Sequence, residues 1–445
     1  MYLCKKQKTC RIFMKDVKQK PSVAYYLLRK YSNAFVFRWF SEVDVNGKEN
    51  TPQDSPCIIL PCHQNALMDC LTVIAVFKKP ITFFAKSSLF VNTLVSNFLI
   101  FLRIMPAYRQ QDGLQKVAKN EDNFLKAVDL LLHGFPLCIM PEGGQEEKHN
   151  LRPFAKGPFR IALYAQEKLP EDKSIYLIPV GLDYGNYDKA GYPLVLNIAK
   201  PIDVRSYMSA YKDNPAKTLN LLKEEAYQSL SKNMLDIQSE NYYDVIYKAA
   251  YLYNYSMLKK LNLEDNQTNR FKARQVIAKR LDEIVVTNLS EMQLLAEKYN
   301  SLLKKDIDFI SIANNYPKQQ FVFLLPYVIL FFPVFLYGFL LNFLVILLVW
   351  ILEPKLKNSG FTATMKYAVF ILFSPVNHLL FSVLVAVITS LWLVPLIIFL
   401  TGMPITVFCK KYIEKFRILK NIFLRNKYKK EISEICIEIN KTISK

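Results

Sequence analysis

Residues 57–69, CIILPCHQNALMD, decide the fold. The apolar run Cys57–Leu60 predicts a buried strand that ends at Pro61. His63 follows almost at once, and the next segment favours a helix that carries Asp69. The stretch therefore predicts a strand, a turn with a histidine and a helix with a carboxylate.

The spacing of the histidine and the aspartate limits their geometry. Two residues six positions apart on one helix point about 120° away from each other. His63 must therefore lie in the turn before the helix, with its ring folded back towards Asp69. Asp69 would then accept the Nδ1 hydrogen and leave Nε2 free to take a proton from a substrate hydroxyl. The alternative interpretation is a histidine that caps or packs at a strand end.

Composition points to a membrane surface. The 445 residues carry a formal charge of +20, yet 51% are hydrophobic and 13% aromatic. Strong basicity with high apolarity favours an anionic membrane over nucleic acid, and no nucleic-acid-binding motif is found. The N-terminus is basic without the apolar core of a signal peptide, which predicts a cytoplasmic location for the front of the chain.

The cysteines predict neither disulfides nor a metal site. All eight are scattered, without a Cys-x-x-Cys pair, as fits a reducing compartment. Cys57, Cys62 and Cys70 surround His63, but their spacing matches no common zinc site. We therefore expect no metal and no cofactor.

Pattern changes along the chain divide it into five parts. Strand signals at 57–61, 81–85, 136–140, 175–181 and 193–198 alternate with helix signals. This order predicts an α/β domain with a mostly parallel sheet flanked by helices. The predicted parts are a basic N-terminal and amphipathic segment (1–45, with an interfacial or surface helix at 23–40), the α/β domain (46–205), an α-helical extension (206–315), membrane hairpins (316–410) and a basic cytoplasmic tail (411–445).

The predicted membrane part contains two apolar runs, 321–352 and 367–408. Each exceeds the roughly 20 residues that one span needs. The loop between them holds three lysines, so single crossings would place it outside, against the positive-inside rule. We therefore expect two hairpins, spanning or re-entrant, with both termini inside. Candidate bends are Pro333 and Gly338 in the first run and Pro395, Gly402 and Pro404 in the second.

Four further segments of the α/β domain carry candidate site residues. Basic residues flank a short strand, and a phosphorylated acceptor could be held at its exit. A buried strand later ends in a glutamate and two glycines, and a basic segment opens the next helix. These residues are Arg103 and Arg109, then Glu142, Gly143 and Gly144, then Arg152 and Lys156, and finally Pro179 in Leu177–Gly181.

The order of these blocks resembles the glycerolipid acyltransferase family, which acylates glycerol-3-phosphate or lysophosphatidic acid. The resemblance covers about 50–205. The family's first block is usually written H-x-x-x-x-D, one residue shorter than His63 to Asp69. The wider spacing looks more like the fungal type of glycerol-3-phosphate acyltransferase, which also carries Pro-Glu-Gly-Gly and a hydrophobic C-terminal region.

The resemblance implies a role for each matching residue. His63 would be the base and Asp69 its partner, while Arg103 and Arg109 match the second block. Glu142, Gly143 and Gly144 match the third block and Pro179 the fourth. Gln145 stands where many relatives have an arginine, which puts phosphate binding there in doubt unless Arg109, Arg152 or Lys156 compensates.

The expected chemistry is acyl transfer from acyl-CoA or acyl carrier protein to a phosphorylated glycerol acceptor at a lipid membrane. Backbone N–H groups near the helix start could stabilise the oxyanion. Cys62 is an alternative, nucleophilic candidate. Other readings are another lyso- or amino-lipid acceptor, a phosphate-ester hydrolase using His63 and Glu142, and a non-catalytic membrane scaffold.

Overall fold

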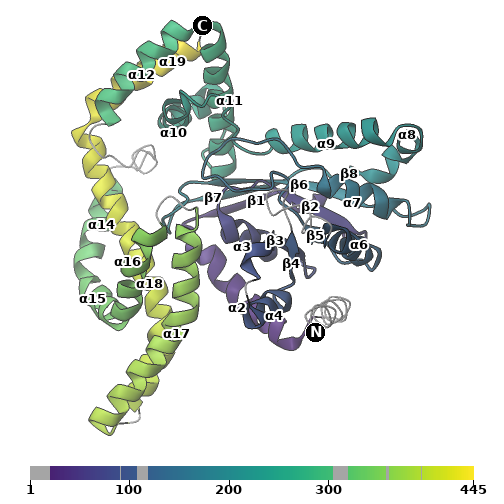
Figure 1. Ribbon diagram of the computed structural model, residues 1–445. Coiled ribbons are helices and arrows are strands. Elements are labelled where there is room, and N and C mark those ends of the chain that lie inside the picture. Colours follow the sequence, from purple (N-terminus) through teal and green to yellow (C-terminus); the bar gives the residue numbers. More distant parts are fainter. Residues whose placement is uncertain are drawn as a thin grey trace.

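The computed structural model describes residues 21–90, 92–107, 119–303, 319–356, 360–391 and 393–444. The α/β part contains a sheet in the order β1-β7-β6-β2-β5-β3-β4, with β8 beside β6 (Figure 1). Neighbouring strands are parallel, except that β7 and β8 run antiparallel to β6. The predicted mostly parallel sheet is confirmed.

The strands lie close to the predicted positions. Strand β2 has the predicted bounds, and β3, β6 and β7 each start within one residue of prediction. Strand β5 is shorter than expected because the chain turns after Met140, whose carbonyl accepts from the Gly143 N–H. Strand β1 was not predicted, and the expected boundary at 45 falls inside it. The bounds are β1 Val43–Asn46, β2 Cys57–Pro61, β3 Thr82–Lys86, β4 Ile104–Ala107, β5 Leu137–Cys138, β6 Tyr176–Tyr184, β7 Leu194–Ile198 and β8 Ile202–Asp203.

Two prolines sit inside the central pair of strands, where a missing N–H usually costs a hydrogen bond. Pro61 turns its backbone towards β5, which ends at Cys138, opposite Ile59. Pro179 turns its backbone towards the gap between β7 and β8, where its carbonyl accepts from the Ala199 N–H. Neither proline interrupts the β2–β6 pairing, which runs from Cys57 to Pro61 and leads directly to His63.

Helices cover both faces of the sheet. Figure 1 shows α2, α3 and α4 below the sheet and α9 above it. Helix α2 packs against α3 and α17 and leaves Val23 and Leu27 exposed, so an interfacial location for 23–40 stays a prediction. The helices of this part are α2 Val23–Trp39, α3 Ala66–Val76, α4 Thr93–Phe101, α6 Lys119–Leu132, α7 Gly157–Gln166, α8 Met208–Asp213 and α9 Pro215–Ser231.

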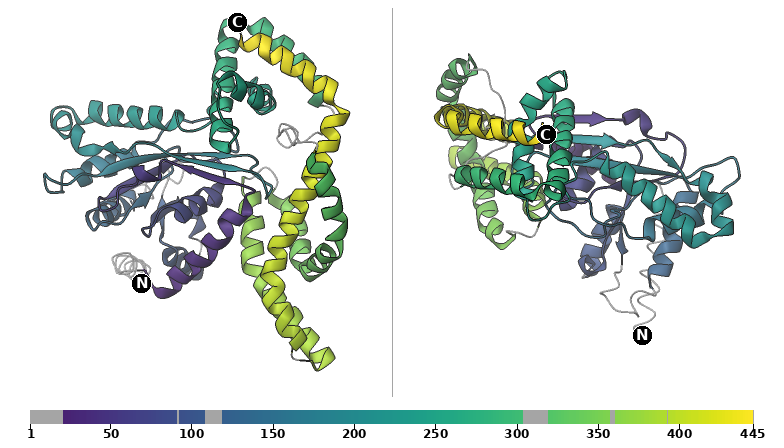
Figure 2. Two further views of the ribbon diagram at one scale, coloured as in Figure 1. Left: turned by 180° about the vertical axis from the view of Figure 1, so that it is seen from behind. Right: turned by 90° about the horizontal axis from the view of Figure 1, so that it is seen from above.

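A second hydrophobic core lies outside the sheet. It joins α10 (Tyr243–Lys260), α11 (Gln267–Thr287) and α12 (Leu289–Leu303) with α19 (Lys429–Ile443). Figure 2 shows α19, in yellow, lying alongside α12. Residues 429–443 therefore belong to the helical extension and are not the separate tail that the sequence predicted. We call α10, α11, α12 and α19 the helical unit.

The apolar C-terminal region forms five helices. They are α14 Gln319–Leu330, α15 Phe332–Leu341, α16 Phe343–Leu356, α17 Thr362–Thr389 and α18 Leu393–Lys427. Among the described residues, α17 and α18 are long and apolar enough to cross a membrane, and α14 with α15, bent by 54°, is a third candidate. The α17–α18 hairpin extends away from the sheet in both views (Figures 1 and 2).

The bends differ from the predicted positions. The first run breaks at Phe331, near the predicted Pro333, and at Asn342, whereas Gly338 lies inside α15. The second run reverses near Ser390, which adopts a left-handed conformation. Pro395, Gly402 and Pro404 all lie within α18. Gly402 packs against His378 of α17, so its missing side chain allows close helix approach instead of a bend.

Candidate active site

His63 and Asp69 meet as the spacing requires. The His63 Nδ1 lies 3.0 Å from the Asp69 Oδ2, and the helix that carries Asp69 begins only at Ala66. The histidine therefore lies in the turn, as expected. Its side chain is 19% exposed while that of Asp69 is fully buried, so one edge of the ring can face a substrate.

The turn closes around the carboxylate of Asp69. Its Oδ2 also accepts from the backbone N–H groups of Gln64, at 3.0 Å, and Asn65, at 2.9 Å. Its Oδ1 accepts from the Tyr184 hydroxyl at 2.7 Å. A buried carboxylate needs such partners, because burial without them costs several kcal/mol. Ala66 has a left-handed backbone, with φ at 43°, which turns the chain back towards Asp69.

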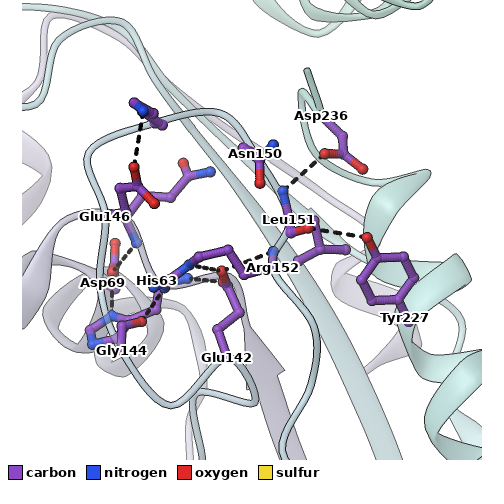
Figure 3. Close-up of polar contacts among 12 residues, drawn as sticks. His63, Asp69, Glu142, Gly144, Glu146, Asn150, Leu151, Arg152, Tyr227 and Asp236 are labelled. Carbon is purple, nitrogen blue, oxygen red and sulfur yellow. Dashed lines mark hydrogen bonds and ion pairs between the residues drawn. The ribbon is translucent and has the colours of Figure 1, made fainter. Parts of the chain in front are cut away.

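Glu142 holds the same turn from the next strand. Its Oε1 accepts from the backbone N–H of His63 at 2.8 Å, and its Oε2 accepts from the Arg152 Nε at 3.0 Å (Figure 3). Burial raises the pKa of Glu142, while the hydrogen bond from His63 and the charge of Arg152 oppose this shift. Glu142 therefore orients the turn that carries His63, and both of its oxygens accept hydrogen bonds from protein donors.

The two glycines after Glu142 shape the loop that Arg152 closes. Gly143 has φ at 69°, a conformation that favours glycine. The carbonyl of Gly144 accepts from the guanidinium of Arg152. The backbone N–H of Glu146 donates to the His63 carbonyl at 3.2 Å, so this loop also contacts the catalytic turn. Arg152 remains 27% exposed despite these bonds.

Arg103 does not join this site. It precedes β4 and lies level with the start of β3, because Phe83 pairs with Ile104. His63 follows the opposite, carboxyl end of β2. Arg103 is 5% exposed, donates to the Thr82 hydroxyl at 3.0 Å and lies over the Phe135 ring. The predicted role in holding an acceptor phosphate therefore does not fit its position, because Arg103 lies at the amino end of a strand that runs parallel to β2.

The remaining predicted residues lie in different surroundings. Arg109 lies outside the described residues. Lys156 is exposed at the start of α7. Pro179 is buried in β6, so it is part of the strand and is not exposed to solvent. Gln145 lies against Gly360, just before α17, and so contacts the membrane part of the chain.

The structure argues against Cys62 as a nucleophile and against the expected oxyanion donors. Cys62 is fully buried and accepts from the Leu182 N–H at 3.2 Å, and burial raises its thiol pKa well above the usual value. The N–H groups of His63, Gln64 and Asn65 already donate to Glu142 and Asp69, so they are not free for an oxyanion. In the part of the chain that the structure describes, no three His, Cys, Asp or Glu side chains gather at a metal site.

Sequence reasoning missed three residues behind the turn. Tyr184 and Tyr187 come from the end of β6 and the loop after it, and His149 comes from the loop after Gly144. Tyr184 bonds to Asp69, and Tyr187 bonds to both Gln64 and His149. Two tyrosines in sequence after the fourth block were a weak signal, because nothing in their spacing indicated that they face the first block.

Comparisons with known proteins agree with the resemblance seen in the blocks. Residues 42–183 match the family model described as Acyltransferase. A 1-acyl-sn-glycerol-3-phosphate acyltransferase of Borreliella burgdorferi is 32% identical over 122 residues, 27% of this chain and 46% of that protein. Glycerol-3-phosphate O-acyltransferase 1 of Saccharomyces cerevisiae is 28% identical over 99 residues, 22% of this chain and 13% of that protein.

A second yeast protein and a solved structure complete the comparison. Glycerol-3-phosphate O-acyltransferase 2 of Saccharomyces cerevisiae is 32% identical over 112 residues, 25% of this chain and 15% of that protein. The crystal structure of the 1-acyl-sn-glycerophosphate acyltransferase from Thermotoga maritima matches with 19% identity and a TM-score of 0.33, covering 51% of this chain and 82% of that one.

The family model matches the sheet domain. The aligned part spans less than half the length of each curated relative. All four blocks, from His63 to Pro179, fall within the matched range. The likeness to the acyltransferase family is therefore carried by residues 42–183 of this chain, which match its family model.

Proposed function

We propose that this protein is a membrane-bound O-acyltransferase. It transfers a fatty acyl group from a thioester, acyl-CoA or acyl carrier protein, to the hydroxyl of glycerol-3-phosphate or lysophosphatidic acid. The observation that carries the proposal is the 3.0 Å contact between His63 and Asp69, inside the domain that matches the acyltransferase family. The relatives' printed names suggest the acceptor class.

The mechanism uses His63 as a general base. Asp69 holds the Nδ1 hydrogen, so Nε2 carries the free lone pair. Nε2 removes the proton of the acceptor hydroxyl as its oxygen attacks the thioester carbonyl. The tetrahedral intermediate then collapses, the C–S bond breaks, and the thiolate leaves. A thiol with a pKa near 8.5 is a good leaving group, so it can leave as a thiolate without a strong acid. The thiolate then takes the proton from the imidazolium, which restores the neutral base.

Positive groups beside the turn suit the acceptor's phosphate. Arg152 keeps part of its guanidinium exposed, and Lys156 lies exposed four residues later. Arg152 is already bonded to Glu142, so it offers its remaining N–H groups at a fixed orientation. We assign the phosphate to this pair, which takes the place of the arginine that many relatives have at the position of Gln145.

The membrane helices keep the site beside its lipid substrates. Long acyl chains partition into the bilayer, so an enzyme that uses them gains from anchorage at that interface. Lys366, at the start of α17, donates to the Asp188 carbonyl at 3.3 Å, so this lysine lies on the same side as the sheet domain. By the positive-inside rule we place the catalytic domain on the cytoplasmic face.

The test is acyl transfer by the purified full-length chain in vesicles. Labelled acyl-CoA or acyl carrier protein is supplied with glycerol-3-phosphate, lysophosphatidic acid or another lyso- or amino-lipid, and products are read by lipid mass spectrometry. We expect His63→Ala to lower kcat by about a hundredfold or more, since a general base contributes 10² to 10⁴.

His133→Ala is the matched control. His133 lies directly after α6 with 54% of its side chain exposed, and we expect the variant to retain full activity and membrane association. Full turnover by His63→Ala would refute the base assignment. No transfer to any acceptor by the unaltered chain would instead favour the membrane scaffold.

A further inference from the structure

Tyr187 contacts both residues that separate His63 from helix α3. Its hydroxyl donates to the Gln64 Oε1 at 3.1 Å, and its carbonyl accepts from the Asn65 Nδ2 at 3.0 Å. Gln64 and Asn65 are almost fully buried, and their backbone N–H groups bind Asp69. Tyr187 therefore binds the side chains of Gln64 and Asn65, whereas Asp69 and Glu142 bind the backbone of the same turn.

The helical unit reaches Tyr187 through His149. The Tyr187 hydroxyl lies 3.0 Å from the His149 Nδ1, and the His149 Nε2 lies 3.0 Å from the Asp183 Oδ1. Asp183 in turn forms an ion pair with Arg274 of α11. Burial alone would raise the pKa of Asp183, but Arg274 and His149 outweigh it and lower the pKa to about 2. The carboxylate thus stays charged and keeps its partners.

Helix α10 encloses the same histidine. The His149 ring stacks on Tyr247, with ring centroids 5.0 Å apart, and its backbone N–H donates to the Tyr243 hydroxyl at 2.9 Å. His149 is fully buried. A buried, hydrogen-bonded network of this kind restricts motion, because every alternative position leaves polar groups without partners.

The membrane helices hold the loop that carries Tyr187. Lys366 of α17 donates to the carbonyl of Asp188, the next residue. Arg417 of α18 donates to the Ala190 carbonyl at 3.2 Å, and its guanidinium lies 4.0 Å from the centroid of the Tyr192 ring. The loop between β6 and β7 therefore contacts the turn of His63 and both α17 and α18 directly, and it reaches the helical unit through His149.

We infer that Tyr187 is a positioning residue for His63, through which the helical unit and the membrane helices fix the catalytic turn. The inference rests on the proposed acyl transfer. Burial raises the pKa of the Tyr187 hydroxyl well above its usual value, so the hydroxyl remains protonated and can donate to Gln64. Through this network the helical unit helps to position His63, a role for the helical extension that the sequence did not predict.

Tyr187→Phe tests the inference, because it removes the hydroxyl and keeps the ring. We expect kcat to fall by about tenfold to a hundredfold, as for a misplaced catalytic group, with the acceptor KM within about twofold. Tyr253→Phe is the matched control. Tyr253 is a hydrogen-bonded tyrosine at a more buried position than Tyr187, and it donates to the Asn440 Oδ1 at 2.5 Å, between α10 and α19, away from the turn. It should leave kcat unchanged.

Amide hydrogen exchange gives a second readout that needs no turnover. The N–H groups of Gln64 and Asn65 should exchange faster in Tyr187→Phe than in the unaltered chain or in Tyr253→Phe. A double-mutant cycle with His149→Phe should show non-additive losses in kcat, because both substitutions break the same Tyr187–His149 contact.

The outcomes separate this inference from the proposed function. If kcat stays within about twofold, or the two amides exchange at the unaltered rate, Tyr187 does not position the turn. If the unaltered chain transfers no acyl group, the proposed function fails, and hydrogen exchange alone then decides whether Tyr187 holds the turn.

Discussion

Two buried carboxylates, Asp69 and Glu142, hold the catalytic turn mainly through backbone N–H groups. Asp69 accepts from Gln64 and Asn65, and Glu142 accepts from His63. Charged acceptors form stronger hydrogen bonds than neutral ones, so the position of the imidazole is set by its own main chain. This explains how His63 and Asp69 can meet although they are six positions apart: the turn wraps around the carboxylate.

Glu147 lies in the loop after the glycines, and its raised pKa predicts that the stability of the fold depends on pH. Burial and the nearby Asp188 carboxylate raise its pKa from 4.5 to about 7. The folded chain therefore binds this proton more tightly than the unfolded chain. Its contribution to stability is fully present below pH 4.5 and is lost as the pH rises through about 7.

We expect Glu147→Gln to raise the apparent Tm at pH 8 and to leave it nearly unchanged at pH 5. The gain should be on the order of 1 kcal/mol, since Glu147 is partly exposed and solvent screens its charge. Thermal unfolding in detergent at the two pH values measures it. An equal shift at both would show that Glu147 does not titrate in this range.

At the scale of elements, α19 completes the second core. Ile435, Ile439 and Ile443 recur every four residues and are buried against α10, α11 and α12. Ile437 lies on the opposite face and is 64% exposed. Because more than a hundred residues lie between α12 and α19, the helical unit cannot close its core until residues 429–443 have been synthesised.

Ile439→Ala should therefore destabilise the helical unit by about 2–4 kcal/mol through a buried cavity. Ile437→Ala, the matched control, should change stability by less than about 0.5 kcal/mol. Apparent Tm and the rate of proteolysis within α10–α12 measure both. Similar losses for the two variants would mean that α19 does not pack as described.

The sequence predicted elements well where local pattern and burial agree. The run Cys57–Pro61 is apolar throughout and became β2. Strand β1 was not predicted, because its four residues are too few to show a periodic pattern. The packing of α19 was not predicted either, because the high charge of 411–445 drew more weight than the spacing of its isoleucines. Helix geometry predicted that His63 must lie in the turn if it contacts Asp69, and a capping or packing histidine was left open. The position of Arg103 followed from its place before a strand that runs parallel to β2, and this consequence was not drawn from the sequence.

At the scale of the whole molecule, the α17–α18 hairpin and the sheet domain should lie in different environments. Large apolar side chains such as Leu380, Leu384 and Val387 of α17 are exposed. Both helices contact the sheet domain through lysines, Lys366 near the start of α17 and Lys410 midway along α18. We expect this hairpin to cross a bilayer twice and to present its turn, near Ser390, to the far side.

A cysteine at the turn tests this arrangement. In sealed vesicles, Ser390→Cys should react with a membrane-impermeant maleimide only from the side opposite the catalytic domain. Lys212→Cys on α8, exposed on the sheet domain, should react only from the other side. Labelling of both from one side would show that the hairpin enters and leaves the membrane without crossing it.

Helix α18 is continuous over 35 residues, about 52 Å, from the hairpin turn to the start of the helical unit. Gly402 faces His378 near one end, and Arg417 stacks on Tyr192 further along. One inserted residue between them would rotate every later side chain by about 100° and move Arg417 off its ring. Seven inserted residues would restore the direction but move Arg417 about 10 Å along the axis. Natural variation in length should therefore avoid the segment between Gly402 and Arg417 and occur at the hairpin turn or in loops.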